Sequence, residues 1–182
     1  MPPPRWIGLL PLGFLSLAVA VNARSGTPET LLWICNVSNA LLAIAIFAAW
    51  PRGLWAATLW LIVGMPLWFI DSWANHTLAP HSFLTHIVSA ALGVWAVRRV
   101  PAPEGIWWQS LIYGVSLCGL ARLLTAPEAN VNLAYRVPGP TTELMPSFAV
   151  SWVVHTAALG AALWGVQKVL GRLWLVVRTE RA

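Results

Sequence analysis

Three of the four histidines of this chain lie in one polar passage, residues 71–86, between two strongly apolar segments. Its side chains could ligate zinc or iron, because imidazole and carboxylate groups both suit these metals. The spacing of Asp71, His81 and His86 matches no dedicated metal motif such as H-E-x-x-H, so we predict no metal site. What the passage can do then depends on the groups that other segments bring to it.

The composition defines the environment of these groups. Hydrophobic residues make up 58% of the 182 residues, charged residues make up 9%, and the mean hydropathy is +0.69. No water-soluble domain of this size shows such a balance, so we expect an integral membrane protein. The net charge of +5 fits membrane topology and contact with anionic lipid. No basic-aromatic pattern of a nucleic-acid module is evident, so we expect no nucleic-acid partner.

The apolar runs predict the fold. A run of about 20 apolar residues can cross a ~30 Å hydrocarbon layer as a helix that satisfies its own backbone. Six such runs predict an all-α polytopic protein, in which residues 1–182 form one six-helix transmembrane domain. The first run could instead be a signal peptide, and Pro51-Arg52-Gly53 is expected to separate the second run from the third. The six ranges are 6–22, 30–50, 54–73, 78 or 82 to 97, 106–125 and 146–167.

The distribution of charge predicts the orientation. With six crossings, eight of the eleven basic residues fall on the side of the two termini, and four of the six acids fall on the opposite side. By the positive-inside rule both termini are cytoplasmic. Several tryptophans, including Trp50, Trp55 and Trp73, lie near predicted helix ends, where an amphipathic ring suits the headgroup region.

Polar residues share one face on three of the predicted helices. They recur at intervals of three or four residues, the spacing that places side chains above one another on a helix. The ridge on the fifth helix ends in a cation, Arg122, and we expect it to face other helices or a cavity. The faces consist of Cys35, Ser38 and Asn39; of Ser110, Gly114, Cys118 and Arg122; and of Ser147, Ser151 and His155.

The residues that could do chemistry come from five predicted helices but all fall in the outer half of the bundle. Ionisable groups inside a membrane are costly, so those that persist there are candidates for function. Residues 126–145 form a long loop at the same end, and such loops often act as lids or binding segments. We therefore predict an outer pocket covered by this extracytoplasmic loop. Its candidate residues are Cys35, Asp71, His86, Cys118, Arg122 and His155.

Three parts of the sequence carry a family resemblance. Residues 32–38 (LWICNVS), His86 and residues 130–135 (NVNLAY) resemble the scattered signature of YwaF-type bacterial membrane proteins. Those proteins are similar to a eukaryotic transmembrane acyltransferase and, more distantly, to the androgen-induced-gene-one-like intramembrane lipid hydrolases. The resemblance implies a protein of the bacterial inner membrane that acts on acyl lipids or small amphiphiles, either alone, as a homo-oligomer or with partner membrane proteins.

The resemblance also implies a mechanism. Cys35 would be the nucleophile and His86 the base, because a thiol attacks well only after a neighbouring imidazole takes its proton. Asp71 would complete the catalytic group by orienting the imidazole, a role that Asn39 could also fill. An arginine or asparagine of the pocket would stabilise the developing oxyanion. The residues expected to bind substrate are Arg122, His155, Asn39, Asn132 and Ser151.

Two other classes of function remain open at the level of sequence. His86 and His155 could hold a haem as axial ligands or hydrogen-bond a quinone, so the cofactor is not determined. The chain could also be a non-catalytic structural or transport subunit of a larger membrane complex. A disulfide between Cys35 and Cys118 would remove the proposed nucleophile, if both sulfurs meet in the outer half.

Overall fold

The computed structural model describes residues 2–74, 79–136, 145 and 147–179, and these residues form helices and turns without a strand. The all-α class is therefore confirmed. The chain begins with a 3-10 turn η1 (Arg5–Gly8) and helix α1 (Leu9–Arg24). The remaining elements are η2 (Pro28–Leu32), α2 (Ile34–Phe47), α3 (Pro51–Ala74), α4 (Pro80–Phe83), η3 (Leu84–Val88), α5 (Ser89–Val97), α6 (Ile106–Leu124), η4 (Val131–Leu133) and α7 (Phe148–Thr179).

Within this part of the chain, three helices are long and apolar enough to cross a membrane, judged by length and composition. They cover Arg5–Arg24, Pro51–Trp73 and Phe148–Leu173, while Ile34–Phe47 is a shorter apolar helix. The first and third expose most of their apolar side chains, as expected of helices that face lipid. These features support a membrane protein.

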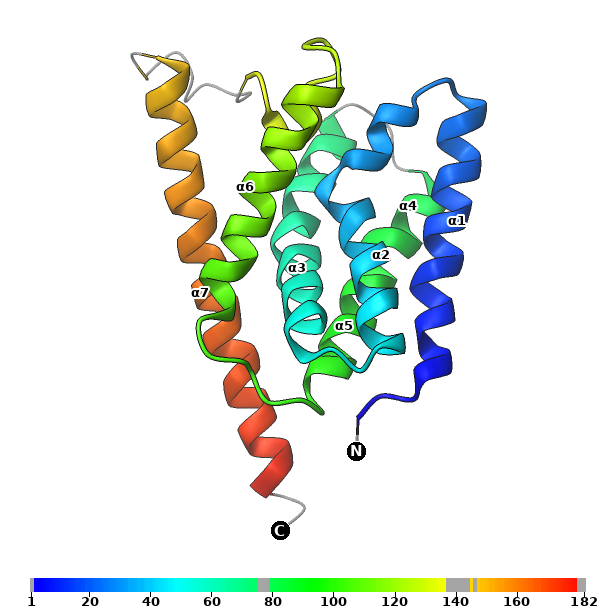
Figure 1. Ribbon diagram of the computed structural model, residues 1–182, viewed down its shortest axis with the longest axis vertical. Coiled ribbons are helices and arrows are strands. Elements are labelled where there is room, and N and C mark those ends of the chain that lie inside the picture. Colours follow the sequence, from blue (N-terminus) through cyan, green and yellow to red (C-terminus); the bar gives the residue numbers. More distant parts are fainter. Residues whose placement is uncertain (1, 75–78, 137–144, 146, 180–182) are drawn as a thin grey trace.

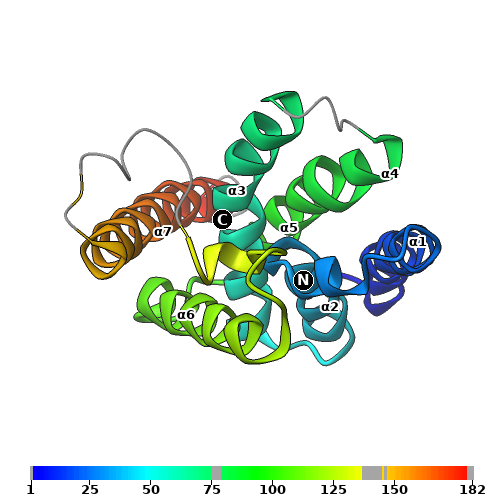
Figure 2. The ribbon, with the colours of Figure 1, turned by 90° about the horizontal axis from the view of Figure 1, so that it is seen from above.

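Helix α3 forms the centre of the bundle, and Figure 2 shows the other helices arranged around it. Its first half is almost completely buried, with Leu59 and Leu61 inaccessible to solvent. After Gly64 the helix leaves the packed core, and Ile70 and Trp73 are about two-thirds exposed. The second half of α3 is therefore covered on fewer sides than the first.

The helices run back and forth between two ends of the bundle. Figure 1 shows that the start of η1, the turn from α2 to α3, the end of α5 and the end of α7 lie at one end. We call the opposite end, which carries η2 and η4, the loop end. The pocket predicted from the sequence is expected at the loop end, because residues 126–145 begin there.

Several predicted boundaries and one predicted anchor were wrong. The turn between α2 and α3 lies at Ala49, which adopts a left-handed φ of 49°, and Pro51 starts α3 instead of breaking the chain. Proline is tolerated at a first helical position because its missing N–H has no helical partner there. Helix α7 continues to Thr179, well beyond the predicted end at residue 167. Trp55 lies in the core, where its Nε1 donates to the carbonyl oxygen of Val100 at 3.1 Å.

Candidate functional site

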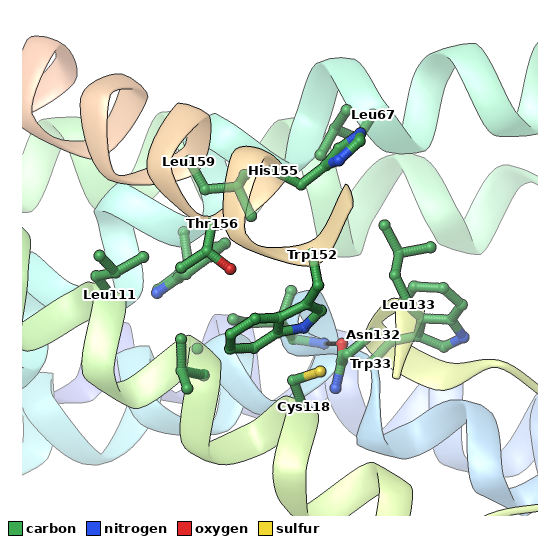
Figure 3. Close-up of a pocket in the computed structure, with 15 residues that line it drawn as sticks. Trp33, Leu67, Leu111, Cys118, Asn132, Leu133, Trp152, His155, Thr156 and Leu159 are labelled. Atoms are coloured by element: carbon green, nitrogen blue, oxygen red, sulfur yellow. Dashed lines mark hydrogen bonds between the residues drawn. The ribbon is translucent and has the colours of Figure 1, made fainter. Parts of the chain in front are cut away.

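A cavity of about 120 Å³ lies between α3, α6 and α7, directly under the start of α2 and under η4. Its wall is mainly apolar, and Cys118, Asn132, His155 and Thr156 supply the principal polar side chains. Figure 3 shows Cys118 and Asn132 on one side of Trp152 and His155 on the other, beside Leu67. The apolar wall includes Trp33, Trp60, Leu67, Leu111, Trp152 and Leu159.

Gly114 allows Trp60 to lie across α6 and form part of this wall. A Cβ atom at Gly114 would overlap the indole ring of Trp60. The ring is held in place because its Nε1 donates to the carbonyl oxygen of Ser110 at 2.7 Å. Gly114 and Cys118 both line the cavity. The middle of the predicted ridge on α6 therefore faces a cavity. The other two ridge residues do not line it, since Ser110 is buried and Arg122 is exposed.

Cys35 lies immediately behind one wall of the cavity. Its side chain is buried, and a Cβ atom added to Gly64 would lie 3.0 Å from the Cys35 sulfur. Gly64 itself lines the cavity, so a glycine separates the thiol from the enclosed space. Cys35 and Cys118 are both free thiols, so the structure does not contain the disulfide considered from the sequence.

Asn39 ties the helix turn that carries Cys35 to the segment that carries His86. Its side-chain nitrogen donates to the carbonyl oxygens of Cys35 at 2.9 Å and of Thr85 at 2.8 Å. Its side-chain oxygen accepts a hydrogen bond from the hydroxyl of Ser89. The amide is inaccessible to solvent and uses both its donor and its acceptor. Asn39 therefore acts on the backbone around His86 and forms no hydrogen bond with the ring in the described structure.

His86 is fixed by a π turn and by a stacked tryptophan. Its ring lies parallel to Trp68 of α3, with centroids 4.4 Å apart and an angle of 10° between the planes. Its Nδ1 lies 2.8 Å from the carbonyl oxygen of Ser82. A carbonyl only accepts, so Nδ1 carries the proton and Nε2 of the neutral ring keeps its lone pair. Ser82 thus holds the imidazole at Nδ1, and the orienting role expected of Asp71 stays a prediction.

The described structure contains no hydrogen bond between His86 and Cys35, and their pairing stays a prediction. Asp71 is exposed on the last turn of α3. His81 is half-buried in the first turn of α4, and His76 lies outside the described residues. Among the residues that are described, no group of three or more histidine, cysteine, aspartate or glutamate side chains could hold a metal ion.

The two histidines considered as haem ligands do not share a site in the described structure. The His155 ring lines the cavity together with Leu67, and its Nδ1 donates to the carbonyl oxygen of Ser151 at 2.7 Å. His86 does not line that cavity and stacks on Trp68 instead. Leu67, which lines the cavity, and Trp68 are neighbours on α3 and point about 100° apart, so the cavity and the His86 ring lie on different faces of this helix.

Asn132 fastens the loop after α6 to the start of α2. Its side-chain oxygen accepts the N–H of Ile34, and its side-chain nitrogen donates to the carbonyl oxygen of Leu32, both at 2.8 Å. The N–H groups of a first helical turn have no partner within the helix, so Asn132 satisfies one of them. A residue predicted to bind substrate therefore already uses both ends of its amide in the fold.

Arg122 holds the same loop from the other side. Its guanidinium donates to the carbonyl oxygen of Ala134 at 2.8 Å and lies 5.1 Å from the centre of the Tyr135 ring. The Tyr135 hydroxyl lies 2.6 Å from the carbonyl oxygen of Arg122 and 2.8 Å from that of Thr125. Arg122 thus holds the loop against α6. If Arg122 also binds substrate, as predicted, its guanidinium must do so while it donates to Ala134.

Ser151 is buried, and its hydroxyl has no hydrogen-bond partner in the described structure. Ser151 does not line the cavity. Its backbone carbonyl oxygen accepts the hydrogen bond that orients His155, which does line it. No sequence signal singled out Trp68 or Trp152. For Gly64 the available signal was a glycine within a long apolar run, which is typical of a close approach between helices.

Comparison of the chain with protein-family models, curated proteins and solved structures finds no match. The resemblance to the YwaF-type proteins therefore stays a prediction.

Proposed function

We propose that this chain is a multi-pass protein of the bacterial inner membrane that acts as an acyl-lipid hydrolase or acyltransferase. Six transmembrane helices would place both termini in the cytoplasm. Two observations support this topology: η1 starts and α7 ends at the same end of the bundle, and Arg52 and Arg98 lie at the ends of α3 and α5 that point there. A basic end of this kind favours the cytoplasmic side.

The observation that carries the proposed activity is the position of the Cys35 sulfur behind Gly64. The cavity offers an apolar wall for a hydrocarbon chain, which is what an acyl group needs. A nucleophile that acts on this acyl group must lie beside the cavity without filling it. Cys35 meets this condition because its sulfur would lie 3.0 Å from a Cβ atom on Gly64, which lines the cavity, while Cys35 itself does not line it.

The chemistry would proceed in two steps. The Cys35 sulfur attacks the carbonyl carbon of an acyl ester, and Nε2 of His86 takes the thiol proton. The ester C–O bond breaks, and the alcohol leaves with that proton. Water or a second alcohol then attacks the thioester, releases the acid or a new ester, and returns the proton to the thiol. Since the two residues are not hydrogen-bonded in the structure, the proton transfer needs a bridging water or a closer approach when substrate binds.

The test uses the purified full-length chain in detergent micelles with p-nitrophenyl palmitate as the probe. We expect release of p-nitrophenol that Cys35→Ala abolishes. His86→Ala should lower the rate about 100-fold or more, the usual contribution of a general base. His81→Ala is the matched control, because His81 is a half-buried histidine of the neighbouring turn and should leave the rate unchanged. Equal rates in the wild type and in Cys35→Ala would refute the proposed nucleophile.

A further inference from the structure

The loop end of the cavity is lined by residues of a segment that several hydrogen bonds hold in place. Trp33 and Leu133 line the cavity at this end, together with Asn132. The amide of Asn132 is bonded to the backbone on both sides of Trp33, and Arg122 holds the loop at Ala134. Entry from this end would require several of these hydrogen bonds to break together.

The opposite end of the cavity is closed by close packing. Trp60 lies across Gly114 there, with its indole nitrogen bonded to the backbone of α6. Helices α6 and α7 also approach closely, since a Cβ atom on Gly160 would lie 3.2 Å from a methyl group of Leu111. Leu163, one turn further along α7, is inaccessible to solvent. No route through the bundle from this end is evident among the described residues.

The side between α3 and α7 is different. Leu67 lines the cavity, yet 54% of its surface is exposed. Beyond it on α3, Ile70 is also exposed, as are Val153 and Val154 next to His155 on α7. Figure 3 shows His155 directed toward Leu67. Because these exposed neighbours are apolar, this side of the cavity suits contact with lipid chains.

We propose that the ligand enters the cavity sideways from the bilayer, between Leu67 of α3 and His155 of α7. The ligand class is a single-chain amphiphile already dissolved in the membrane. A cavity of about 120 Å³ has room for part of one hydrocarbon chain, being smaller than the ~300–1,000 Å³ of most small-molecule pockets. The Nδ1–H of His155 is committed to Ser151, so Nε2 can accept a hydrogen bond from a hydroxyl in the headgroup. This route rests on the cavity invoked in the proposed function but not on catalysis by Cys35.

Cys118 provides a built-in reporter, because its thiol lines the cavity. In a Cys35→Ser background it is the sole cysteine of the chain. The protein is reconstituted in phosphatidylcholine vesicles and treated with a long-chain N-alkylmaleimide, which dissolves in the bilayer, or with a charged methanethiosulfonate, which stays in water. Mass spectrometry follows the modification of Cys118 over time.

We expect the alkylmaleimide to modify Cys118 at least tenfold faster than the charged reagent. Leu67→Trp should slow the alkylmaleimide about fivefold or more by narrowing the entrance, and Leu67→Ala should accelerate it. Leu123→Trp is the control, because Leu123 is 83% exposed on α6 and does not line the cavity. Faster modification by the charged reagent, no response to either substitution at Leu67, or reaction only after denaturation would each overturn the route. Absence of ester turnover by the wild-type protein, with Cys118 labelled as expected in the Cys35→Ser protein, would refute the proposed enzyme and leave the lateral route standing.

Discussion

The side-chain nitrogen of Asn39 lies 2.8 Å from the carbonyl oxygen of Thr85, a residue 46 positions away in the sequence. Thr85 belongs to the π turn η3, and π turns interrupt the regular ladder of helical hydrogen bonds. The bond gives this carbonyl a partner inside the bundle and places the turn of Cys35 beside the turn of His86. One buried amide thus connects the two segments on which the proposed chemistry depends.

Asn39→Ala should destabilise the protein more than a comparable change at a less buried asparagine. Removing the amide takes one buried hydrogen bond from the carbonyl of Thr85 and one from the hydroxyl of Ser89, which keeps its bond to Leu84, at about 0.5–1.5 kcal/mol for each bond lost. Thermal unfolding in detergent measures the effect. Asn36→Ala is the control, because Asn36 is only half-buried and makes one hydrogen bond, to Thr30. A midpoint in Asn39→Ala equal to that of the control would show that the network contributes nothing.

Two substitutions at Asn132 should separate its two hydrogen bonds. Asn132→Asp keeps an oxygen that can accept the N–H of Ile34, whereas Asn132→Ala removes it. We therefore expect the Ile34 amide to exchange with deuterium faster in Asn132→Ala and to stay protected in Asn132→Asp. Both variants lose the bond to Leu32 and should loosen the loop. Unchanged exchange of Ile34 in Asn132→Ala would contradict the capping role.

Two glycines of α6 provide a matched pair of Gly→Ala changes. At Gly114 the new methyl group would overlap the buried ring of Trp60, so we expect a loss of about 1–3 kcal/mol, typical of an overpacked core. At Gly119 the same methyl group would have no neighbour within 4 Å. There we expect a gain of about 0.5–1 kcal/mol, because alanine is the better helix former. Thermal unfolding of both variants checks the difference, and equal midpoints would argue against the position of Trp60.

The proposed topology can be tested with cysteines placed at two exposed acids in the Cys35→Ser, Cys118→Ser background. Glu128 lies in the loop after α6, and Glu104 lies just before α6. In cells whose inner membrane is intact but accessible from outside, a charged maleimide should modify a cysteine at 128 and spare one at 104. The positive-inside rule gives this expectation. The reverse pattern would invert the orientation, and labelling of both from outside would rule out a membrane-spanning α6.

Much of the helical arrangement could be predicted from apolar runs and residue spacing. The all-α class follows from composition and from the requirement that backbone groups in lipid be satisfied within helices. The four-residue spacing of Gly114 and Cys118 placed both on one side of α6, and both line the cavity. The prediction failed where local signals were ambiguous: Pro51 was compatible with a break or a helix start, and Trp55 with an anchor or a core residue.

The connections across the bundle could not be predicted. The cap that Asn132 places on Ile34 joins residues 98 positions apart, and no local pattern indicates such a pair. The stacking of His86 on Trp68 depends on how the turn after α3 returns the chain. For the same reason, the sequence could not show that the fold uses the hydrogen-bonding groups of Asn39, Asn132 and Arg122, and their contact with substrate stays a prediction. Residue types indicated that polar side chains gather in one half of the bundle. Only the packing of the helices showed which partner each polar group binds.

The most direct test of the account is to look for an acyl thioester on Cys35. The purified protein is incubated with p-nitrophenyl palmitate, quenched in acid, and digested for mass spectrometry. We predict a palmitoyl group on the peptide that contains Cys35, removable by hydroxylamine, formed more slowly in His86→Ala because the thiol loses its base, and missing in Cys35→Ala. Turnover without an adduct on Cys35, or with the palmitoyl group on Cys118 instead, would contradict the central claim that Cys35 is the nucleophile.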